Sequence, residues 1–263
     1  RLWRWVGLST QMNRKVSIID SGVFPILKIE NFLSDTEYKE IQDEVKKEVL
    51  NLNGLLDKGM VADTRYSING KDFVRVDLDT KYMKDRTKSR ILTIIQKDIF
   101  NNEMFEIYNT VPETSYKLIK ESTNHETELT VYKDKSTYNW HIDDIQRRMI
   151  NFVLMIDLGM KFDGGHTQIS NVGFDTLGER ILFDGGLDID VAIDIEPKGN
   201  QLIMMPMWVT HRVTQVKMKS KNLIDGRITV NGHIGYVPKM TNIVGAERIR
   251  LMATEVNEIR AGD

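Results

Sequence analysis

Residues 138–144 read YNWHIDD and set His141 and Asp143 one residue apart. In a β-strand, residues i and i+2 point to the same face, so this short run would bring the two side chains together. An imidazole and a carboxylate on one face can bind a metal ion. The pair alone is weak evidence, because a chain with 5 His and 38 acidic residues among 263 produces about one such pair by chance. Its meaning depends on the rest of the sequence.

The composition of the chain limits the classes of function. Its 263 residues, 41% of them hydrophobic, are enough to bury one substantial core. The formal charge of -2, from 36 basic and 38 acidic residues, gives no overall positive field for nucleic acid, so nucleic acid is not the expected partner. The chain has no cysteine, which excludes disulfides, thiolate zinc sites and cysteine nucleophiles. A metal ion would have to be bound by His, Asp, Glu or water.

The second half of the sequence has the texture of an antiparallel β-protein. From about Tyr116, short apolar or alternating runs are separated by turn signals. Asp-Gly pairs occur at 163–164, 184–185 and 225–226, and each is suited to a hairpin turn with a positive φ. This half therefore predicts a β-sandwich or barrel.

The first half indicates helices that support such a sheet. Ser34 and Glu37 form the pattern of a capping box, which predicts a helix from there to about Leu50. Residues 72–80 alternate like a half-buried strand, and 86–102 return to a helical period. The apolar stripe of the first helix consists of Tyr38, Ile41, Val45 and Val49.

Several enzyme classes lack their sequence signals in this chain. There is no dinucleotide fingerprint, no phosphate-binding P-loop and no Gly-x-Ser-x-Gly elbow, which argues against hydride transfer, nucleotide hydrolysis and serine hydrolysis. The longest apolar runs, MINFVLMI and LIMMPMWV, have the length of strands, so we expect no membrane span and a cytoplasmic protein. Residues 1–15 are predicted to be a leader or surface extension.

Further candidate ligands lie downstream of His141. His211 falls in the alternating run PMWVTHRVTQVKM, 206–218, and Arg227 and Thr229 open the strand-like run RITVNGHIGY, 227–236. A hairpin centred near Lys219 would place His211 opposite Arg227, with Thr229 on the same face. These side chains would then converge with the first pair inside one barrel.

Such a set has a specific chemical meaning. Two imidazoles and one carboxylate form the facial triad of non-haem Fe(II) oxygenases, which leaves three coordination positions open. A structural zinc site would be closed by a fourth protein ligand. An Arg inside the same barrel is costly to bury alone, and its planar fork matches a carboxylate, so it predicts an anionic co-substrate.

Four blocks of the sequence resemble the Fe(II)- and 2-oxoglutarate-dependent dioxygenases, in particular their prolyl 4-hydroxylase-like branch. The blocks are YKDKSTYNWHIDD (132–144), FDGGHTQIS (162–170), IEPKGNQLIMMPMWVTHRVTQV (195–216) and GRITVNGHIGY (226–236). The resemblance covers about residues 126–238, and FPILKIENFLSDTEYKEI (24–41) resembles the first strand and helix of that branch. Residues 175–194 look like an insertion relative to it.

The resemblance implies roles for six residues. His141, Asp143 and His211 would be both the catalytic centre and the iron ligands, as in the family's His-x-Asp and distal His. Arg227 and Thr229 match its Arg-x-Ser/Thr pair, which holds the far carboxylate of 2-oxoglutarate. Tyr132 matches the Tyr that lines the co-substrate site, and Tyr138 is a weaker match.

The resemblance also implies the fold and the reaction. The expected fold is mainly β with N-terminal helices (α+β), a double-stranded β-helix or jelly roll. We expect one domain over 16–263, with helical support over about 16–115 and the jelly-roll core over about 116–240. The expected reaction hydroxylates a C–H bond and releases succinate and CO2, with Fe(II), 2-oxoglutarate and O2 and with ascorbate as a possible additional cofactor. The expected substrate is a prolyl residue in a peptide or protein, and residues 53–72 are predicted to form a mobile flap over it.

Alternatives remain open at this point. The chain could be a non-catalytic jelly-roll binding module, or an oxygenase acting on a free amino acid, another small molecule or a nucleobase. Arg227 could instead form an ion pair with Asp225. His166 and His233 are expected to line the pocket or the core, and His125 is expected at the surface.

Overall fold

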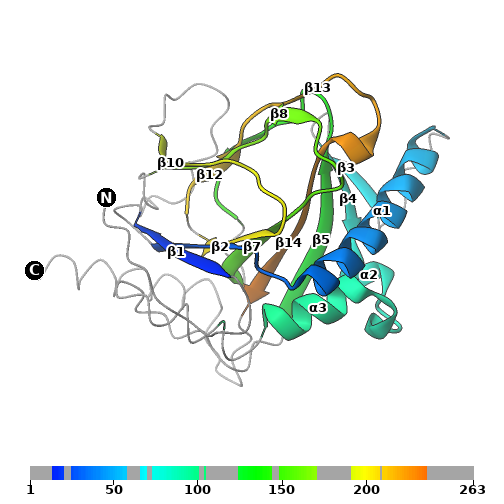
Figure 1. Ribbon diagram of the computed structural model, residues 1–263, viewed down its shortest axis with the longest axis horizontal. Helices are drawn as coiled ribbons and strands as arrows, with labels where there is room; N and C mark the ends of the chain where they lie inside the picture. Colours follow the sequence, from blue (N-terminus) through cyan, green and yellow to red (C-terminus); the bar gives the residue numbers. More distant parts are fainter. Residues whose placement is uncertain are drawn as a thin grey trace, which may run out of the picture.

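The strands of the protein form two facing sheets and a short ribbon. The computed structural model describes residues 14–20, 25–57, 66–69, 73–100, 104, 124–143, 148–170, 191–207 and 209–235 (Figure 1). The strands are β1 (Lys15–Asp20), β2 (Pro25–Glu30), β3 (Tyr66–Asn69), β4 (Phe73–Asp77), β5 (Asn124–Tyr132), β6 (Tyr138–His141), β7 (Arg148–Ile156), β8 (Phe162–Gly164), β9 (Thr167–Ser170), β10 (Val191–Ile195), β11 (Gln201–Pro206), β12 (His211–Val213), β13 (Val216–Met218) and β14 (Arg227–Gly235). The helices are α1 (Asp35–Asp57), α2 (Leu78–Lys81) and α3 (Arg90–Asp98), with 3-10 turns η1 (Arg86–Lys88) and η2 (Leu223–Asp225).

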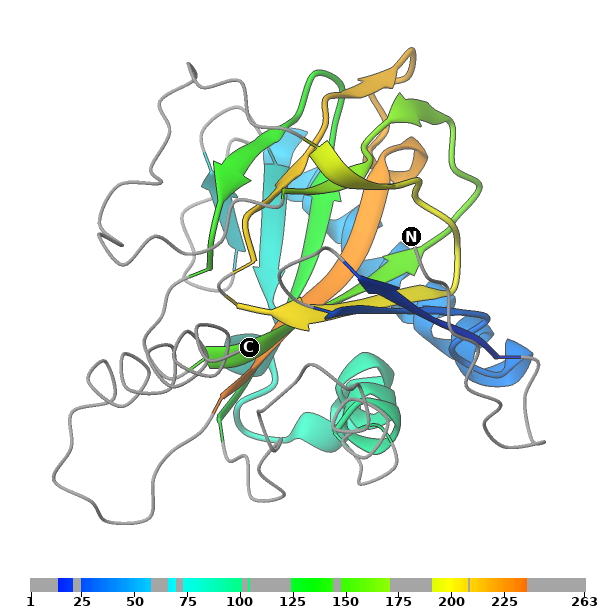
Figure 2. The same cartoon turned by 90° about the vertical axis from the view of Figure 1, so that its left-hand side faces the viewer.

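The larger sheet has the strand order β1-β2-β11-β7-β14-β5-β4-β3, and the smaller sheet has the order β10-β9-β12-β6. β13 and β8 form the separate two-stranded ribbon. Figure 2 shows the two sheets facing each other across a common interior. This mainly β arrangement, in which the described helices α1 and α3 pack outside the larger sheet, confirms the jelly-roll fold expected from the sequence.

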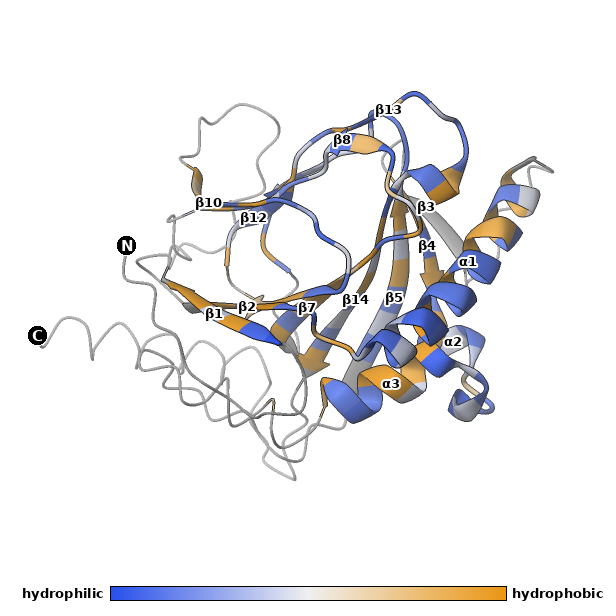
Figure 3. Ribbon diagram, viewed as in Figure 1, coloured by the Kyte–Doolittle hydropathy of each residue, from blue (hydrophilic) through white to orange (hydrophobic). Residues whose placement is uncertain are grey.

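The outer face of the larger sheet packs on the helices. Leu129 and Val131 of β5 and Ile228 and Val230 of β14 belong to one hydrophobic cluster with residues of α1 and α3. In Figure 1 these helices lie on the same side of the sheet, and in Figure 3 the strands behind them alternate between hydrophobic and hydrophilic residues. The helical layer thus buries one face of β5 and β14 and leaves the other face for the interior.

β14 shows this division most clearly. Its even-numbered residues are Ile, Val, Gly and Ile, whereas its odd-numbered residues are Arg227, Thr229, Asn231 and His233, followed by Gly235 at the end of the strand. Because successive side chains of a strand point to opposite faces, all four polar residues point into the interior between the sheets. The strand pairs with β5 on one side and with β7 on the other, so it lies in the middle of the larger sheet.

A second hydrophobic cluster joins the two sheets. It combines residues of β2 and β11 in the larger sheet with residues of β9 and β10 in the smaller one. Its buried members are Ile26, Ile169, Ile193, Ile195, Ile203, Met205 and Val209. The interior between the sheets is therefore apolar around these strands and polar along β14.

The first helix begins as predicted but ends later. Ser34 and Glu37 form the capping box, since the Glu37 amide donates to the Ser34 hydroxyl and the Ser34 amide donates to the Glu37 carboxylate, each at 3.3 Å. The predicted end near Leu50 is wrong, and the helix continues to Asp57. Leu52 is fully buried and Leu56 packs against the same cluster, so the apolar stripe runs about two further turns and stabilises them.

The Asp-Gly pairs do not all form the predicted turns. Gly164 has a φ of +75°, but it is the last residue of β8 and the chain continues into β9 of another sheet, so it does not form a hairpin turn. Gly226 has a φ of -82° and caps η2, so the prediction of a positive φ there is wrong. A Cβ at Gly226 would lie 2.3 Å from the carbonyl oxygen of Tyr132, so a close approach of two backbones requires the glycine. The pair at 184–185 lies outside the described residues.

The predicted hairpin between His211 and Arg227 is also wrong. β12 belongs to the smaller sheet and β14 to the larger one. The chain between them forms β13, which pairs with β8, and then η2. His211 is paired with His141 and Ile169, whereas Arg227 is paired with Tyr132. The His and the Arg therefore come from opposite walls of the interior.

Three predicted segments are only partly described. In the predicted leader, only 14–15 is described; Arg14 donates to the carbonyl of Phe32 at 2.7 Å, and β1 begins at the next residue. In the predicted flap, 53–57 is the end of α1 and 66–69 is β3, paired with β4, so these parts are regular structure and not a loop. Residues 58–65 and 70–72 lie outside the described residues. In the predicted insertion, 191–194 belongs to β10, which pairs with β9, so these residues are part of the sheet.

Within the described residues, no helix combines the length and the apolar character needed to cross a membrane. The single-domain organisation over 16–263 stays a prediction.

Candidate functional site

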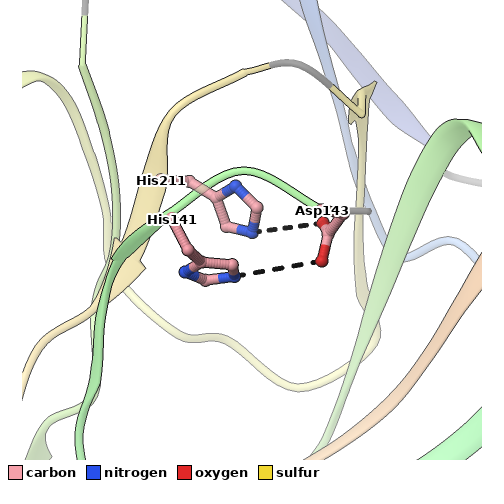
Figure 4. Close-up of side chains that lie close together, drawn as sticks. All are labelled: His141, Asp143 and His211. Atoms are coloured by element: carbon pink, nitrogen blue, oxygen red, sulfur yellow. Dashed lines mark ion pairs between the residues drawn. The ribbon is translucent and has the colours of Figure 1, made fainter. Parts of the chain in front are cut away.

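Two histidines are brought together by strand pairing in the smaller sheet. His141 ends β6, His211 begins β12, and the two residues are direct partners in the antiparallel register. Their ring centroids are 4.2 Å apart. Asp143 lies two residues beyond β6, where its backbone amide donates to the carbonyl of Met207 at 3.2 Å. Figure 4 shows both rings turned toward the carboxylate of Asp143.

The three side chains form a group that can hold one metal ion. Nε2 of His141 lies 3.9 Å from Oδ1 of Asp143, and Nε2 of His211 lies 3.6 Å from Oδ2 (Figure 4). One ligand atom from each residue lies within 4.8 Å of the other two. Among the described residues this is the one group of three or more such side chains. Two nitrogens and one carboxylate are the donor set that suits non-haem iron.

The second nitrogen of each ring identifies the tautomer. Nδ1 of His141 lies 2.7 Å from the carbonyl oxygen of Asn139, and Nδ1 of His211 lies 2.8 Å from that of Val209. A carbonyl only accepts, so both Nδ1 atoms carry the proton. The lone pairs of both Nε2 atoms then face Asp143, which is the orientation that metal-binding histidines need.

The electrostatics of the site keep one of these rings neutral. Burial, with a smaller contribution from nearby His211, lowers the pKa of His141 to about 3, although Asp143 opposes the shift. A neutral imidazole is the form that binds metal ions. The ring of Tyr138 stacks on His141 with centroids 3.8 Å apart, so it limits how far that imidazole can rotate.

Arg227 faces the interior from the opposite sheet. It is 2% exposed, and its guanidinium lies over the ring of Tyr132 at 4.9 Å. Nε donates to the carbonyl of Gly165 at 2.8 Å and Nη2 donates to the hydroxyl of Thr167 at 3.1 Å. These neutral acceptors orient the guanidinium but leave its charge without a carboxylate among the described residues.

The predicted alternative partner of Arg227 is engaged elsewhere. Asp225 forms an ion pair with Lys161, with 3.0 Å between the charged atoms. The pKa of Arg227 is lowered by burial, which reflects the cost of holding the cation away from water. The structure therefore contradicts the ion pair between Arg227 and Asp225.

Thr229 and Tyr132 adjoin Arg227. Thr229 points to the same face of β14, is fully buried, and its hydroxyl has no hydrogen-bond partner within the described structure. Tyr132 is the direct partner of Arg227 in the sheet, and burial raises its pKa to about 12. A buried cation beside an unpaired hydroxyl fits an anion with several acceptor oxygens, such as a dicarboxylate.

Two interior residues complete the surroundings of Asp143. Asn151 of β7 donates from Nδ2 to Oδ2 of Asp143, and its Oδ1 lies 2.6 Å from Nδ1 of His233. The sequence analysis missed Asn151. The signal available was a single amide inside the apolar run MINFVLMI, because a polar side chain is costly in a buried strand unless it has partners.

Of the remaining histidines, none whose side chain is described belongs to the metal-binding group. Nδ1 of His166 lies 3.1 Å from the carboxylate of Asp194, and the side chain of His166 is one-third exposed, so it is neither core nor ligand. His233 points into the interior, as expected for a pocket-lining residue. The side chain of His125 lies outside the described part of the chain.

Comparisons with known proteins identify the superfamily that this chain resembles. Residues 127–235 match the family model of the 2OG-Fe(II) oxygenase superfamily, which confirms the resemblance to the Fe(II)- and 2-oxoglutarate-dependent dioxygenases. That span includes Tyr132, the metal-binding group, Arg227 and Thr229. The superfamily uses Fe(II) and 2-oxoglutarate. A search of curated proteins found no significant match.

Solved structures share the fold at low sequence identity. The non-haem alpha-ketoglutarate-dependent epimerase SnoN from nogalamycin biosynthesis is 12% identical, covers 82% of both chains and has a TM-score of 0.50. A candidate oxygenase from Shewanella oneidensis is 11% identical over 87% of this chain and 90% of its own, also with a TM-score of 0.50. A prolyl-4-hydroxylase from Pseudomonas putida is 16% identical over 81% of this chain and 93% of its own, with a TM-score of 0.41. The two likenesses at 0.50 establish the jelly-roll fold.

Proposed function

We propose that this protein is an Fe(II)- and 2-oxoglutarate-dependent oxygenase in which His141, Asp143 and His211 bind the metal ion. The observation that carries the proposal is the pairing of two features in one interior. The first is a three-ligand group with both Nε2 lone pairs turned to one carboxylate. The second is a buried arginine whose charge has no carboxylate partner among the described residues.

The donor set favours iron over a structural metal. Three protein ligands leave coordination positions for a co-substrate and for O2, whereas a structural zinc site uses four. When bound, Fe(II) and 2-oxoglutarate supply the oxidation of a C–H bond, with release of succinate and CO2. The neutral state of His141 keeps its lone pair available for the ion at physiological pH.

Arg227, Thr229 and Tyr132 are proposed to bind the far carboxylate of 2-oxoglutarate. The contacts from Gly165 and Thr167 hold the guanidinium in place before the co-substrate arrives, which lowers the entropy cost of binding. The Thr229 hydroxyl can donate to a carboxylate oxygen, which satisfies a group that is otherwise buried without a partner. The ring of Tyr132 forms one wall beneath the guanidinium.

Titration of the protein without oxygen tests this proposal directly. Fe(II) followed by 2-oxoglutarate should produce a visible charge-transfer band, which requires the keto acid to chelate the bound iron. Asp143→Ala should keep the fold but lose tight iron binding and the band, because one of three ligands is missing. A wild-type protein that gives no band, or an Asp143→Ala variant that binds stoichiometric iron and turns over normally, would contradict the assignment.

The proposed substrate is a prolyl residue in a peptide or protein. The support is the resemblance of FDGGHTQIS and PKGNQLIMMPMWVTH to the prolyl 4-hydroxylase-like branch. Mass spectrometry of proline-containing peptides incubated with enzyme, Fe(II), 2-oxoglutarate and ascorbate should show one added oxygen on proline. If peptides stay unmodified while a free amino acid or a nucleobase is oxidised with coupled succinate release, the proposed prolyl substrate is contradicted. A non-catalytic binding module would release no succinate with any substrate.

The cytoplasmic location stays a prediction.

A further inference from the structure

The carboxylate of Asp143 is held from the sheet opposite to the one that carries the histidines. His141 and His211 belong to the smaller sheet, whereas Asn151 lies on β7 of the larger sheet. The Asn151 amide donates to Oδ2 of Asp143 across the interior. Asp143 itself lies beyond the end of β6, so the pairing of that strand alone does not orient its side chain.

The directions of these hydrogen bonds follow from elementary chemistry. Oδ2 of an ionised Asp143 can only accept, so the Asn151 group that faces it must be the NH2. The amide oxygen of Asn151 then faces Nδ1 of His233 at 2.6 Å, and that nitrogen must carry the proton. His233 therefore determines which way the amide points, and the amide determines where the carboxylate points.

The strand register makes this chain of contacts rigid. His233 and Asn151 are direct partners in the pairing of β14 with β7, in the middle of the larger sheet. Asn151 is 3% exposed and its neighbours along β7, Ile150 and Phe152, are buried in the hydrophobic core. An amide in such a strand is costly to desolvate, and both of its ends are used by polar groups of the candidate site.

We propose that Asn151 and His233 are positioning residues that fix the metal-binding carboxylate of Asp143. One lone pair of Oδ2 is used by the Asn151 amide, which restrains rotation of the carboxylate and disfavours binding of the ion through both oxygens. The coordination positions that the co-substrate and O2 need then stay open. This inference rests on the proposed function, because it assumes that Asp143 binds the metal ion.

Metal binding in variants that differ only in these hydrogen bonds tests the proposal. Asn151→Leu keeps the approximate volume and removes both contacts. His233→Leu removes the donor that orients the amide, whereas His233→Asn keeps a donor close to the position of Nδ1. The matched control is Gln168→Leu, because Gln168 is an amide of the smaller sheet that accepts from Arg212 and not from the candidate site.

The readouts are the dissociation constant for Co(II), the absorption spectrum of the bound ion, and the 2-oxoglutarate requirement at saturating metal. Loss of such outer contacts typically weakens metal binding about 10- to 100-fold, and we expect this for Asn151→Leu with an altered Co(II) spectrum. His233→Leu should weaken binding in the same direction, and His233→Asn should bind Co(II) more tightly than His233→Leu because it keeps a donor to the Asn151 amide oxygen. The control should bind Co(II) as the wild type does.

Wild-type affinity and spectrum in a folded Asn151→Leu protein would overturn the proposal. If that variant does not fold, the comparison of His233→Leu with His233→Asn decides, and equal affinities in the two would overturn it. Failure of the wild-type protein to bind Co(II) or Fe(II) at all would instead contradict the proposed function. The two failures are therefore distinguishable.

Discussion

Replacing Thr229 by Val should stabilise the protein without 2-oxoglutarate and weaken the binding of 2-oxoglutarate. The side chain is fully buried and its hydroxyl has no hydrogen-bond partner within the described structure. Valine has nearly the same shape, so the substitution changes the polarity of one buried atom and leaves the packing intact. The two opposite effects follow from that single change.

The size of each effect can be worked out. A buried polar group without a partner costs about 1–3 kcal/mol, so the free energy of unfolding should rise by about that amount in the co-substrate-free protein. At about 2–4 °C per kcal/mol for a chain of this size, the melting temperature should rise by about 2–12 °C. A hydrogen bond to a charged group contributes about 1.5–3 kcal/mol, so the Kd for 2-oxoglutarate should rise about 10- to 150-fold.

Thermal unfolding of the Mn(II)-loaded protein with and without 2-oxoglutarate measures both effects in one assay. Thr229→Val should melt above the wild type in the absence of 2-oxoglutarate and gain less from adding it. Thr229→Ser keeps the hydroxyl and should retain most of the response. A Thr229→Val protein that melts below the wild type and responds fully to 2-oxoglutarate would show that this hydroxyl lies outside the co-substrate site.

Three further predictions concern the interior. Arg227→Ala should leave metal binding intact and raise the concentration of 2-oxoglutarate that is required by at least about tenfold, since charge-assisted contacts are lost. Arg227→Lys should recover only part of the affinity for 2-oxoglutarate because the planar fork is missing, and steady-state kinetics over a range of 2-oxoglutarate concentrations measures both effects. Burial depresses the pKa of His141 from 6.5 to about 3, so the contribution of this neutral imidazole to the stability of the metal-free protein should be complete above pH 6.5 and be lost as the pH falls toward 3. Denaturant unfolding as a function of pH should show a shallower loss of stability in His141→Gln than in the wild type. Gly226→Ala should destabilise the protein by about 1–3 kcal/mol, because the added Cβ would lie 2.3 Å from the carbonyl oxygen of Tyr132. An unchanged midpoint of urea unfolding would refute this close contact.

Local patterns in the sequence predicted the parts of this fold that depend on local chemistry. The capping box at Ser34, the helical stripe that follows it and the alternating strand that begins at Arg227 are all present. Each depends on the period of a single segment, and the sequence contains that information directly. The spacing of His141 and Asp143 also indicated two side chains that the structure brings together with His211, although Asp143 lies beyond the end of the strand.

Long-range pairing was the part that could not be predicted. An alternating run specifies which residues share a face, but it does not specify the sheet to which the strand belongs. The predicted hairpin therefore placed His211 beside Arg227, whereas the two residues lie in opposite sheets. Asn151 was missed for the same reason, because its two partners are 8 and 82 residues away in the chain and only the folded sheets bring them together.

The alternation of β14 has a consequence for folding. A slip of one residue in the pairing of this strand would turn Arg227 and His233 toward the helices and Ile228 toward the interior. An unpaired guanidinium in that hydrophobic layer would cost several kcal/mol, so the polar residues of the proposed site also select the correct register against its nearest competitors. Substituting them with apolar residues would remove this selection. Low yields of such variants would then arise during folding, through misaligned strands that aggregate, even where the native state is stable.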